Sequence, residues 1–124
     1  MEPLEDRTLK FALRAIDVVD RIPRGRAGDV VSTQFLESAT SVGANWREAQ
    51  GAASSNDFNY KVGICERESR ESHYWLQIIF AWLLRGDREV VALGTEANEL
   101  VSIFTSIGRK TSKKRTPKKP QQDP

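Results

Sequence analysis

Residues 38–49 read SATSVGANWREA, and the predicted fold follows from them. Very small side chains stand in the middle of a helical pattern, just before the larger Trp46. Gly43 costs a helix roughly 1 kcal/mol relative to alanine, so a packing contact must offset that cost. Small side chains allow a second helix to approach closely. We therefore expect a bundle of helices built around this contact.

The helix that contains this stretch is predicted over residues 28–53. Its apolar side chains recur at alternating steps of four and three, which is the spacing of a helix–helix seam: Phe35, Ala39, Val42, Trp46, Ala49 and Ala53. Asn45 and Glu48 adjoin this seam beside Trp46. A buried polar residue can fix the register between helices, so we interpret Gly43, Asn45, Trp46 and Glu48 as structural residues.

Three further helices are predicted over residues 6–22, 57–84 and 88–107. Pro23 ends the first, Ser55 or Asn56 caps the third, and a turn at residues 85–87 ends it, with Asp87 capping the fourth. The seam of the third helix includes two small residues, Ser69 and Ser72, which we expect to face the small stretch of the second helix. Short connections favour an all-α, antiparallel up-down-up-down four-helix bundle over residues 1–108.

Two segments carry more apolar surface than one bundle requires. The first helix has two apolar rows, Leu9, Leu13 and Ile16, and Phe11, Ala15, Val18 and Ile22. The third helix is apolar nearly all round over residues 75–84, starting at Trp75, a further structural residue, so we expect it to be covered on more than one side. The surplus predicts a subunit interface, and hence a homo-oligomer.

The net charge of +2 hides an asymmetry along the chain. Residues 1–108 hold 12 Lys/Arg and 16 Asp/Glu, whereas residues 109–124 hold seven basic residues and one acid. Gly108 is predicted to close the last helix. Residues 109–124 cannot bury a core, so we expect a disordered basic tail. The single cysteine, the acidic N-terminus and the lack of a long apolar run favour a cytoplasmic protein without a membrane partner.

Basic side chains are the candidate contacts to nucleic acid, because they neutralise phosphates without reading sequence. The alternative is a solubilising or targeting tail. Arg21, Arg24 and Arg26 cluster at the first connection and would extend the electropositive surface. The candidates are Arg21, Arg24, Arg26, Arg109, Lys110, Lys113, Lys114, Arg115, Lys118 and Lys119.

Little in the sequence favours catalysis, so we expect no enzyme, no cofactor and no metal. His73 is the single histidine, and the residue three before it is Arg70, not the carboxylate of a di-iron motif. Glu66 and His73 could share a face but are interpreted as surface residues. Cys65 is interpreted as a small buried apolar residue. The triplet at residues 85–87 also spells an adhesion motif, which a helix cap and turn explain fully.

A connected set of motifs resembles the four-helix-bundle protein family encoded in intervening sequences of bacterial 23S rRNA genes. It covers about residues 8–107: RIP at 21–23, SATSVGAN at 38–45, Glu48-Ala49, Ser55, Asp57-Phe58, Lys61, Ile64, Glu68, Glu71 and YWL at 74–76. The resemblance implies a homopentamer. It also implies kinship with the accessory variability protein of diversity-generating retroelements, which binds reverse transcriptase and nucleic acid through a basic pentameric surface.

This chain differs from that protein in having an acidic folded body, so the analogy rests on local basic patches and the tail. We expect a non-enzymatic oligomer associated with nucleic acid, RNA above all. The alternative is a protein-interaction scaffold, or an accessory subunit of a reverse transcriptase without nucleic-acid specificity of its own.

Overall fold

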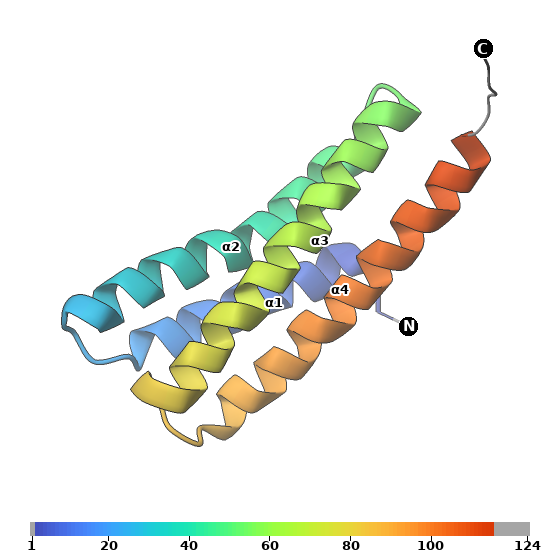
Figure 1. The fold of residues 1–124 in the computed structure, drawn as a ribbon. Helices are drawn as coiled ribbons and strands as arrows, with labels where there is room; N and C mark the ends of the chain where they lie inside the picture. The colour runs from blue at the N-terminus through green and yellow to red at the C-terminus, as the bar shows by residue number, and fades with distance from the viewer. Residues whose placement is uncertain (1, 116–124) are drawn as a thin grey trace, which may run out of the picture.

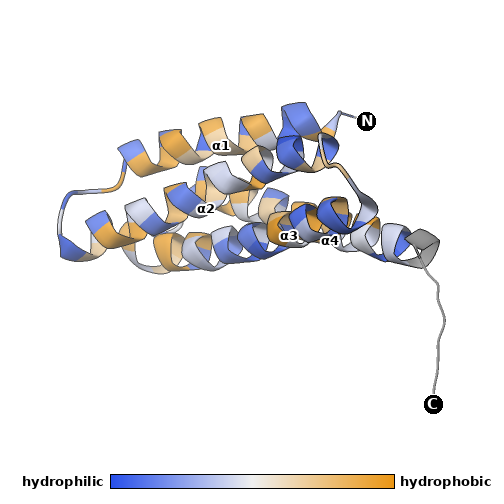
Figure 2. Cartoon of the chain, turned by 90° about the horizontal axis from the view of Figure 1, so that it is seen from above, coloured by the Kyte–Doolittle hydropathy of each residue, from blue (hydrophilic) through white to orange (hydrophobic). Residues whose placement is uncertain are grey.

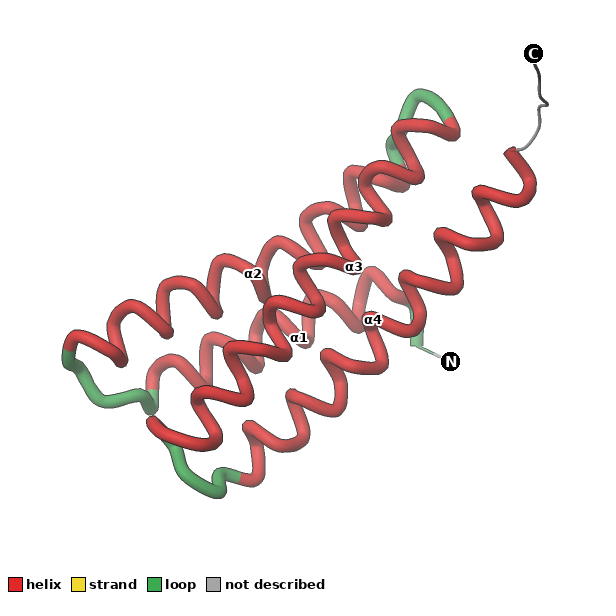
Figure 3. The backbone as a smooth tube through the Cα atoms, viewed as in Figure 1, coloured by secondary structure: helices red, strands yellow, loops and turns green. Residues whose placement is uncertain are grey.

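The computed structural model describes residues 2–115 and places them in four antiparallel helices (Figures 1 and 3). They are α1 (Leu4–Asp20), α2 (Arg26–Gln50), α3 (Ser55–Ile78) and α4 (Arg88–Arg115), with a π-helical turn, η1 (Ile79–Leu83), continuing α3. The most extensive contacts join α2 to α3 and α3 to α4, while α1 lies mainly against α2. The predicted all-α four-helix bundle is confirmed.

The core is one apolar row from each helix. Figure 2 colours the apolar residues of the ribbon orange, buried and exposed alike. Burying a large apolar side chain contributes roughly 1.5–3 kcal/mol to stability. The fully buried large side chains come from all four helices and from η1: Phe11, Val18, Phe35, Val42, Val62, Leu76, Ile79, Val90, Leu93, Leu100 and Phe104. Phe11, Val18, Phe35 and Val42 are among the positions that the three-and-four spacing predicts.

The small stretch of α2 contacts two helices rather than one. A Cβ on Gly43 would lie 2.9 Å from Thr8 Oγ1 and 3.2 Å from Thr8 Cβ, so α1 is the helix that needs this glycine. On the α3 side, the Ser72 hydroxyl donates to Ser38 Oγ over 2.9 Å, in the buried interior. The predicted contact between the small stretch and Ser72 is confirmed. Ser69 instead donates to the Cys65 carbonyl within its own helix.

Trp46 contacts other helices, whereas Asn45 forms its hydrogen bond within its own helix. Trp46 packs edge-on against Phe58, with centroids 6.1 Å apart, and tilted against Phe104 at 5.7 Å, so it joins α2 to α3 and α4. The Asn45 amide donates to the Ser41 carbonyl in its own helix, over 2.8 Å. This local bond does not set the register between helices, which is the role that the sequence suggested for Asn45.

Two more of the predicted structural residues, Glu48 and Trp75, make polar contacts. Glu48 of α2 pairs with Lys61 of α3 at 2.5 Å. Trp75 Nε1 donates to Glu71 one helical turn earlier, over 3.1 Å. Glu48 therefore links two helices, whereas the polar atom of Trp75 is satisfied within α3.

Only one of the two apolar rows of α1 is buried. Phe11, Ala15 and Val18 enter the core, but Leu9, Leu13 and Ile16 stay 47%, 53% and 41% exposed. The surplus at the end of α3 is also uncovered within the chain, because Phe80 is 41% exposed and Trp82 63% exposed. The expectation that this end is covered on more than one side is therefore not met by the single chain.

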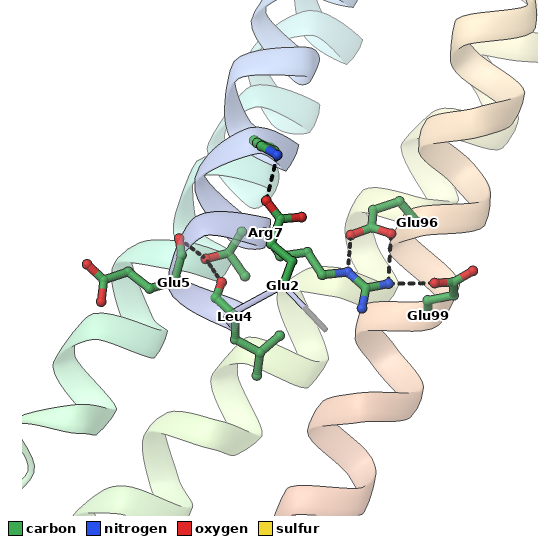
Figure 4. A network of polar contacts seen from close by, with 8 residues as sticks. Glu2, Leu4, Glu5, Arg7, Glu96 and Glu99 are labelled. Carbon is green, nitrogen blue, oxygen red and sulfur yellow. Dashed lines mark hydrogen bonds and ion pairs between the residues drawn. The ribbon is translucent and has the colours of Figure 1, made fainter.

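The edge of α1 that faces α4 is charged. Three arginines at intervals of seven contact acids of α4 and of the turn before it: Arg7 with Glu96 (2.6 Å) and Glu99 (2.5 Å), Arg14 with Glu89 (3.7 Å), and Arg21 with Asp87. Figure 4 shows the fork of Arg7 between the two glutamates. Its pKa is raised above the usual arginine range, first of all by the hydrogen bond to Glu96. This arginine row joins α1 to α4 where apolar contact is sparse.

Three helix boundaries differ from prediction. Helix α1 begins at Leu4, directly after Pro3, and α2 begins at Arg26. Ser54, rather than Ser55 or Asn56, caps α3 by accepting the Asp57 amide proton over 3.1 Å. Three residues of this polar run can act as a cap, so the sequence leaves the choice among them open.

The end of α4 is the largest correction. The helix does not stop at Ile107 with Gly108 as its closing residue, but continues to Arg115. Gly108 stays helical with a Val62 methyl 3.9 Å from the position of its missing Cβ. The Thr111 hydroxyl contacts the Ile107 carbonyl at 2.9 Å and the Asn59 side chain of α3, and cations suit a helix C-terminus. Residues 116–124, the remainder of the predicted tail, lie outside the described residues.

Helix α4 is long and apolar enough over Arg88–Ser112 to cross a membrane. Its apolar character has an explanation in the bundle, because Val90, Leu93, Ala97, Leu100 and Phe104 are buried against the other helices.

Replacing Gly43 by alanine tests the α1–α2 contact. Overpacking costs roughly 1–3 kcal/mol and exceeds the helix-propensity gain of about 1 kcal/mol. We expect Gly43→Ala to lower the free energy of unfolding in urea, and Thr8→Ala to cost less in the Gly43→Ala background than in the wild type. A Gly43→Ala variant as stable as the wild type would contradict the contact.

Asp87 both caps α4, accepting the Val90 amide proton at 3.1 Å, and pairs with Arg21. Asp87→Ala should lower stability by about 1 kcal/mol through loss of the cap. Asp87→Asn keeps a cap acceptor, so it should cost less and resemble Arg21→Gln. If Asp87→Ala and Asp87→Asn lower the free energy of unfolding in urea by the same amount, the helix cap contributes nothing to stability.

The same carboxylate gives a pH dependence of known sign. Arg21 holds the pKa of Asp87 below its ordinary 3.8. A lowered folded pKa contributes stability that is present above the unfolded pKa and is lost as the pH falls through the folded value. The wild type and Asp87→Asn should therefore differ less in free energy of unfolding, measured in urea, at pH values below 3.8 than at neutral pH. A difference that does not change with pH would contradict this role of the Asp87 carboxylate.

Candidate nucleic-acid interface

The candidate cations lie at opposite ends of the bundle (Figure 1). The connection that carries Arg21 and Arg24 is at the same end as the turn before α4, as the Arg21–Asp87 ion pair requires. The basic residues of α4 are at its far end. A helix of 28 residues spans about 42 Å at 1.5 Å per residue. Among the described residues, the basic residues of α4 and the arginines of the first connection therefore do not form one continuous surface.

The arginines at the first connection are largely neutralised by neighbouring acids. Arg21 forks onto Asp87, and Arg24 forks onto Asp29 with contacts of 2.8 and 3.1 Å. The Arg24 hydrogen bond lowers the pKa of Asp29, so that partner stays ionised. Arg26 is exposed and forms no ion pair with a described residue. This end of the bundle offers phosphate one free cation from the predicted set within the described residues.

The far end of α4 is different, because its cations have no acids near them in sequence. Residues 100–115 contain five Lys/Arg and no Asp/Glu. Arg109 and Lys110 are exposed and form no ion pair within residues 2–115. Lys113, Lys114 and Arg115 continue the same helix, so 109 and 113, and 110 and 114, stand one turn apart.

A hollow of about 500 Å³ adjoins this basic end between α3 and α4. Asn59, Gly63 and Glu66 line it from α3, and Thr105, Gly108 and Arg109 line it from α4. Asn59 Nδ2 and Thr105 Oγ1 are buried atoms without a hydrogen-bond partner among the described residues. Glu66 is already paired with Arg70 at 2.9 Å. The hollow therefore places Arg109 and Lys110 beside a wall whose one acid, Glu66, already has a partner.

The single cysteine is poorly suited to act as a nucleophile. Cys65 is buried, its thiol donates to the Val42 carbonyl, and burial raises its pKa to about 12, so it is a poor nucleophile. Within residues 2–115 no three or more His, Cys, Asp or Glu side chains lie together as a metal site would require. The interpretation of Cys65 as a buried apolar residue is supported.

Sequence reasoning identified the cations but missed the hollow beside them. Glycines within the predicted helices could have indicated this hollow, because Gly63 and Gly108 both line it. A glycine in a helix predicts a close approach or an open space, and the sequence does not say which.

Comparison with known proteins matches residues 5–106 to the family of the 23S rRNA-intervening sequence protein. A solved structure of similar fold is a protein of unknown function from the S23 ribosomal protein family of Bacteroides thetaiotaomicron. The two chains are 30% identical, with a TM-score of 0.79, and the match covers 86% of this chain and 99% of that one. No curated protein matches the chain.

Proposed function

The chain belongs to the family of 23S rRNA-intervening sequence proteins, and we propose that it is a non-enzymatic protein that associates with RNA through the basic end of α4. One observation carries the proposal. Arg109 and Lys110 are exposed and unpaired within residues 2–115, and three more cations follow them with no intervening acid, whereas the loop arginines Arg21 and Arg24 are held by Asp87 and Asp29.

This arrangement favours contact with phosphates over reading of bases. No aromatic residue stands among residues 105–115, so base stacking has no platform there. Phosphate contacts give affinity that falls with salt and carries little sequence preference. The family resemblance implies a homopentamer, and several basic ends on one assembly would add avidity without new contacts.

A second candidate is a protein-interaction scaffold, such as an accessory subunit of a reverse transcriptase. The observation that favours it is the exposed aromatic pair Phe80 and Trp82, with the Arg85 guanidinium 5.3 Å from the Trp82 ring centroid. Exposed aromatic and arginine side chains are enriched at protein interfaces. This patch is at the opposite end from the basic end of α4, so the two functions need not compete.

The test is binding of a labelled mixed-sequence single-stranded RNA, measured by fluorescence anisotropy across a series of salt concentrations. Each phosphate contact contributes about 0.7 to the slope of log affinity against log salt for a single strand. We expect Arg109→Gln/Lys110→Gln to weaken binding at low salt and to reduce this slope by about 1.4.

The matched control removes the same charge from the other end. Arg24→Gln/Arg26→Gln should leave the slope within error of the wild type. Equal losses for both pairs would show a diffuse charge effect instead of a site. Absence of RNA binding by the wild-type chain at low salt would reject the proposed function and leave the scaffold as the remaining candidate.

A further inference from the structure

The hollow beside the basic end of α4 has the size of a ligand site. Its volume of about 500 Å³ falls within the range of roughly 300–1,000 Å³ that is usual for pockets that hold a small molecule. A second hollow between the same helices, lined by His73 and Gly94 among others, has about 200 Å³ and falls below that range. The larger hollow lies where α3 begins and α4 ends (Figure 1). It is therefore the better candidate of the two for a binding site.

Two buried polar atoms of residues that line this hollow have no hydrogen-bond partner among the described residues. They are Asn59 Nδ2 and Thr105 Oγ1. The other polar atom of the Asn59 amide is occupied, because its Oδ1 accepts from the Thr111 hydroxyl. An amide nitrogen donates, whereas a threonine hydroxyl can both donate and accept. Buried polar groups without partners destabilise a fold, so a ligand that pairs with them gains affinity.

The two unpartnered atoms belong to different levels of the bundle. Asn59 contacts Thr111, and Thr105 lies six residues earlier in α4, which is about 9 Å along the helix axis. An inorganic phosphate ion is too small to reach both levels. An occupant that pairs with both atoms is therefore an extended molecule with uncharged polar groups along it.

Glycines on both helices keep the hollow open. Gly63 lines it from α3 and Gly108 from α4. A Cβ on Gly63 would meet no atom within 4 Å, and a Cβ on Gly108 would meet only a Val62 methyl at 3.9 Å. Close helix packing requires neither glycine, in contrast to Gly43, whose Cβ would lie 2.9 Å from Thr8 Oγ1. Without side chains at positions 63 and 108, a flat ring can lie against the helix backbone.

The charged residues of the hollow favour an anionic group at its rim. Arg109 and Lys110 line it, are exposed, and form no ion pair within residues 2–115. The acid that lines it, Glu66, is paired with Arg70 at 2.9 Å. The hollow thus combines two exposed cations with buried, uncharged hydrogen-bonding groups.

We propose that this hollow binds one nucleotide, with its phosphate on Arg109 and Lys110 and its base against Gly63 and Gly108. A base is flat and carries donors and acceptors on its edge, and the ribose hydroxyls add more. Base and ribose together reach both unpartnered atoms. The nucleotide is either free or part of an RNA strand whose unstacked base enters the hollow. The second case rests on the proposed function, and there the base contact adds a preference that phosphate contacts lack.

Equilibrium dialysis with the full chain tests the free nucleotide. The probes are the radiolabelled ribonucleoside monophosphates of the four RNA bases, and ribose phosphate as the probe that lacks a base. At least one nucleotide should bind more tightly than ribose phosphate, and Thr105→Val should weaken its binding roughly fivefold through loss of one hydrogen bond. Equal binding of all five probes would rule out the free nucleotide as the ligand.

Two glycine variants show whether the hollow itself is used. Gly63→Leu fills the hollow without removing a charge or a polar group, so it should abolish the preference for the nucleotide over ribose phosphate. Its thermal stability should not fall, since leucine is the better helix former and no atom lies within 4 Å of the added Cβ. Gly94→Leu is the matched control, because it makes the same change at an equally open position in the second hollow. Retained preference in Gly63→Leu, or equal loss in Gly94→Leu, would overturn the proposal.

Fluorescence anisotropy with two labelled strands tests the nucleotide of an RNA. One strand is a mixed-sequence RNA, and the other has the same length and phosphates but abasic nucleotides. If a strand supplies the nucleotide, the first strand binds more tightly and Gly63→Leu removes the difference. Equal binding of both strands, without base-dependent binding of free nucleotides, would overturn this inference and leave the proposed function intact. Base-dependent binding of free nucleotides without binding of either strand would support the inference and reject the proposed function.

Discussion

The contact between Gly43 and Thr8 fixes how closely α1 lies on α2, and the placement of α1 follows from it. A side chain at position 43 would collide with the Thr8 hydroxyl, so only a glycine permits this spacing. With α1 held here, Phe11 and Val18 enter the core, Leu9 and Leu13 point outward, and Arg7 and Arg21 face α4. One helix thus presents a buried row, an apolar ridge and a charged edge, each to a different neighbour.

The distribution of charge separates the two ends of the molecule. Where α1 meets α2 and α3 meets α4, arginines are matched by Asp29 and Asp87, so that end is locally neutral. The end where α4 finishes carries cations without acids in the same segment. An overall count of charge does not reveal this, because the acids that balance the total belong mainly to the first 108 residues. The two ends of the bundle therefore differ in what they offer a partner: one is locally neutral and the other is basic.

The sequence predicted the parts of the fold that depend on periodicity, and failed where the outcome depends on what a residue meets. Phe35 and Val42 were assigned to the helix–helix seam by spacing alone, and both are fully buried. The sequence predicts that Gly108 ends the last helix, because glycine commonly ends helices. In the structure the helix continues, and the contact between Thr111 and Asn59 holds its next turn against α3.

The two apolar rows of α1 were visible in the sequence, but which of them enters the core was not. That choice depends on contacts of α1 with other helices, among them the ion pairs of the arginines at 7, 14 and 21, whose acidic partners are more than 60 residues away in the chain. For the candidate site, the basic residues could be predicted from composition. Their division between paired and unpaired cations could not, because it depends on the same distant contacts.

Because Cys65 is buried, the reactivity of its thiol reports how often the packed helices separate. It is the single cysteine of the protein, fully buried between α2 and α3, with its thiol against the Val42 carbonyl. A thiol reagent can reach it only when these helices separate, and the raised pKa of about 12 slows the reaction further. The rate at which this one sulfur is modified therefore measures how often the interior opens, without any added label.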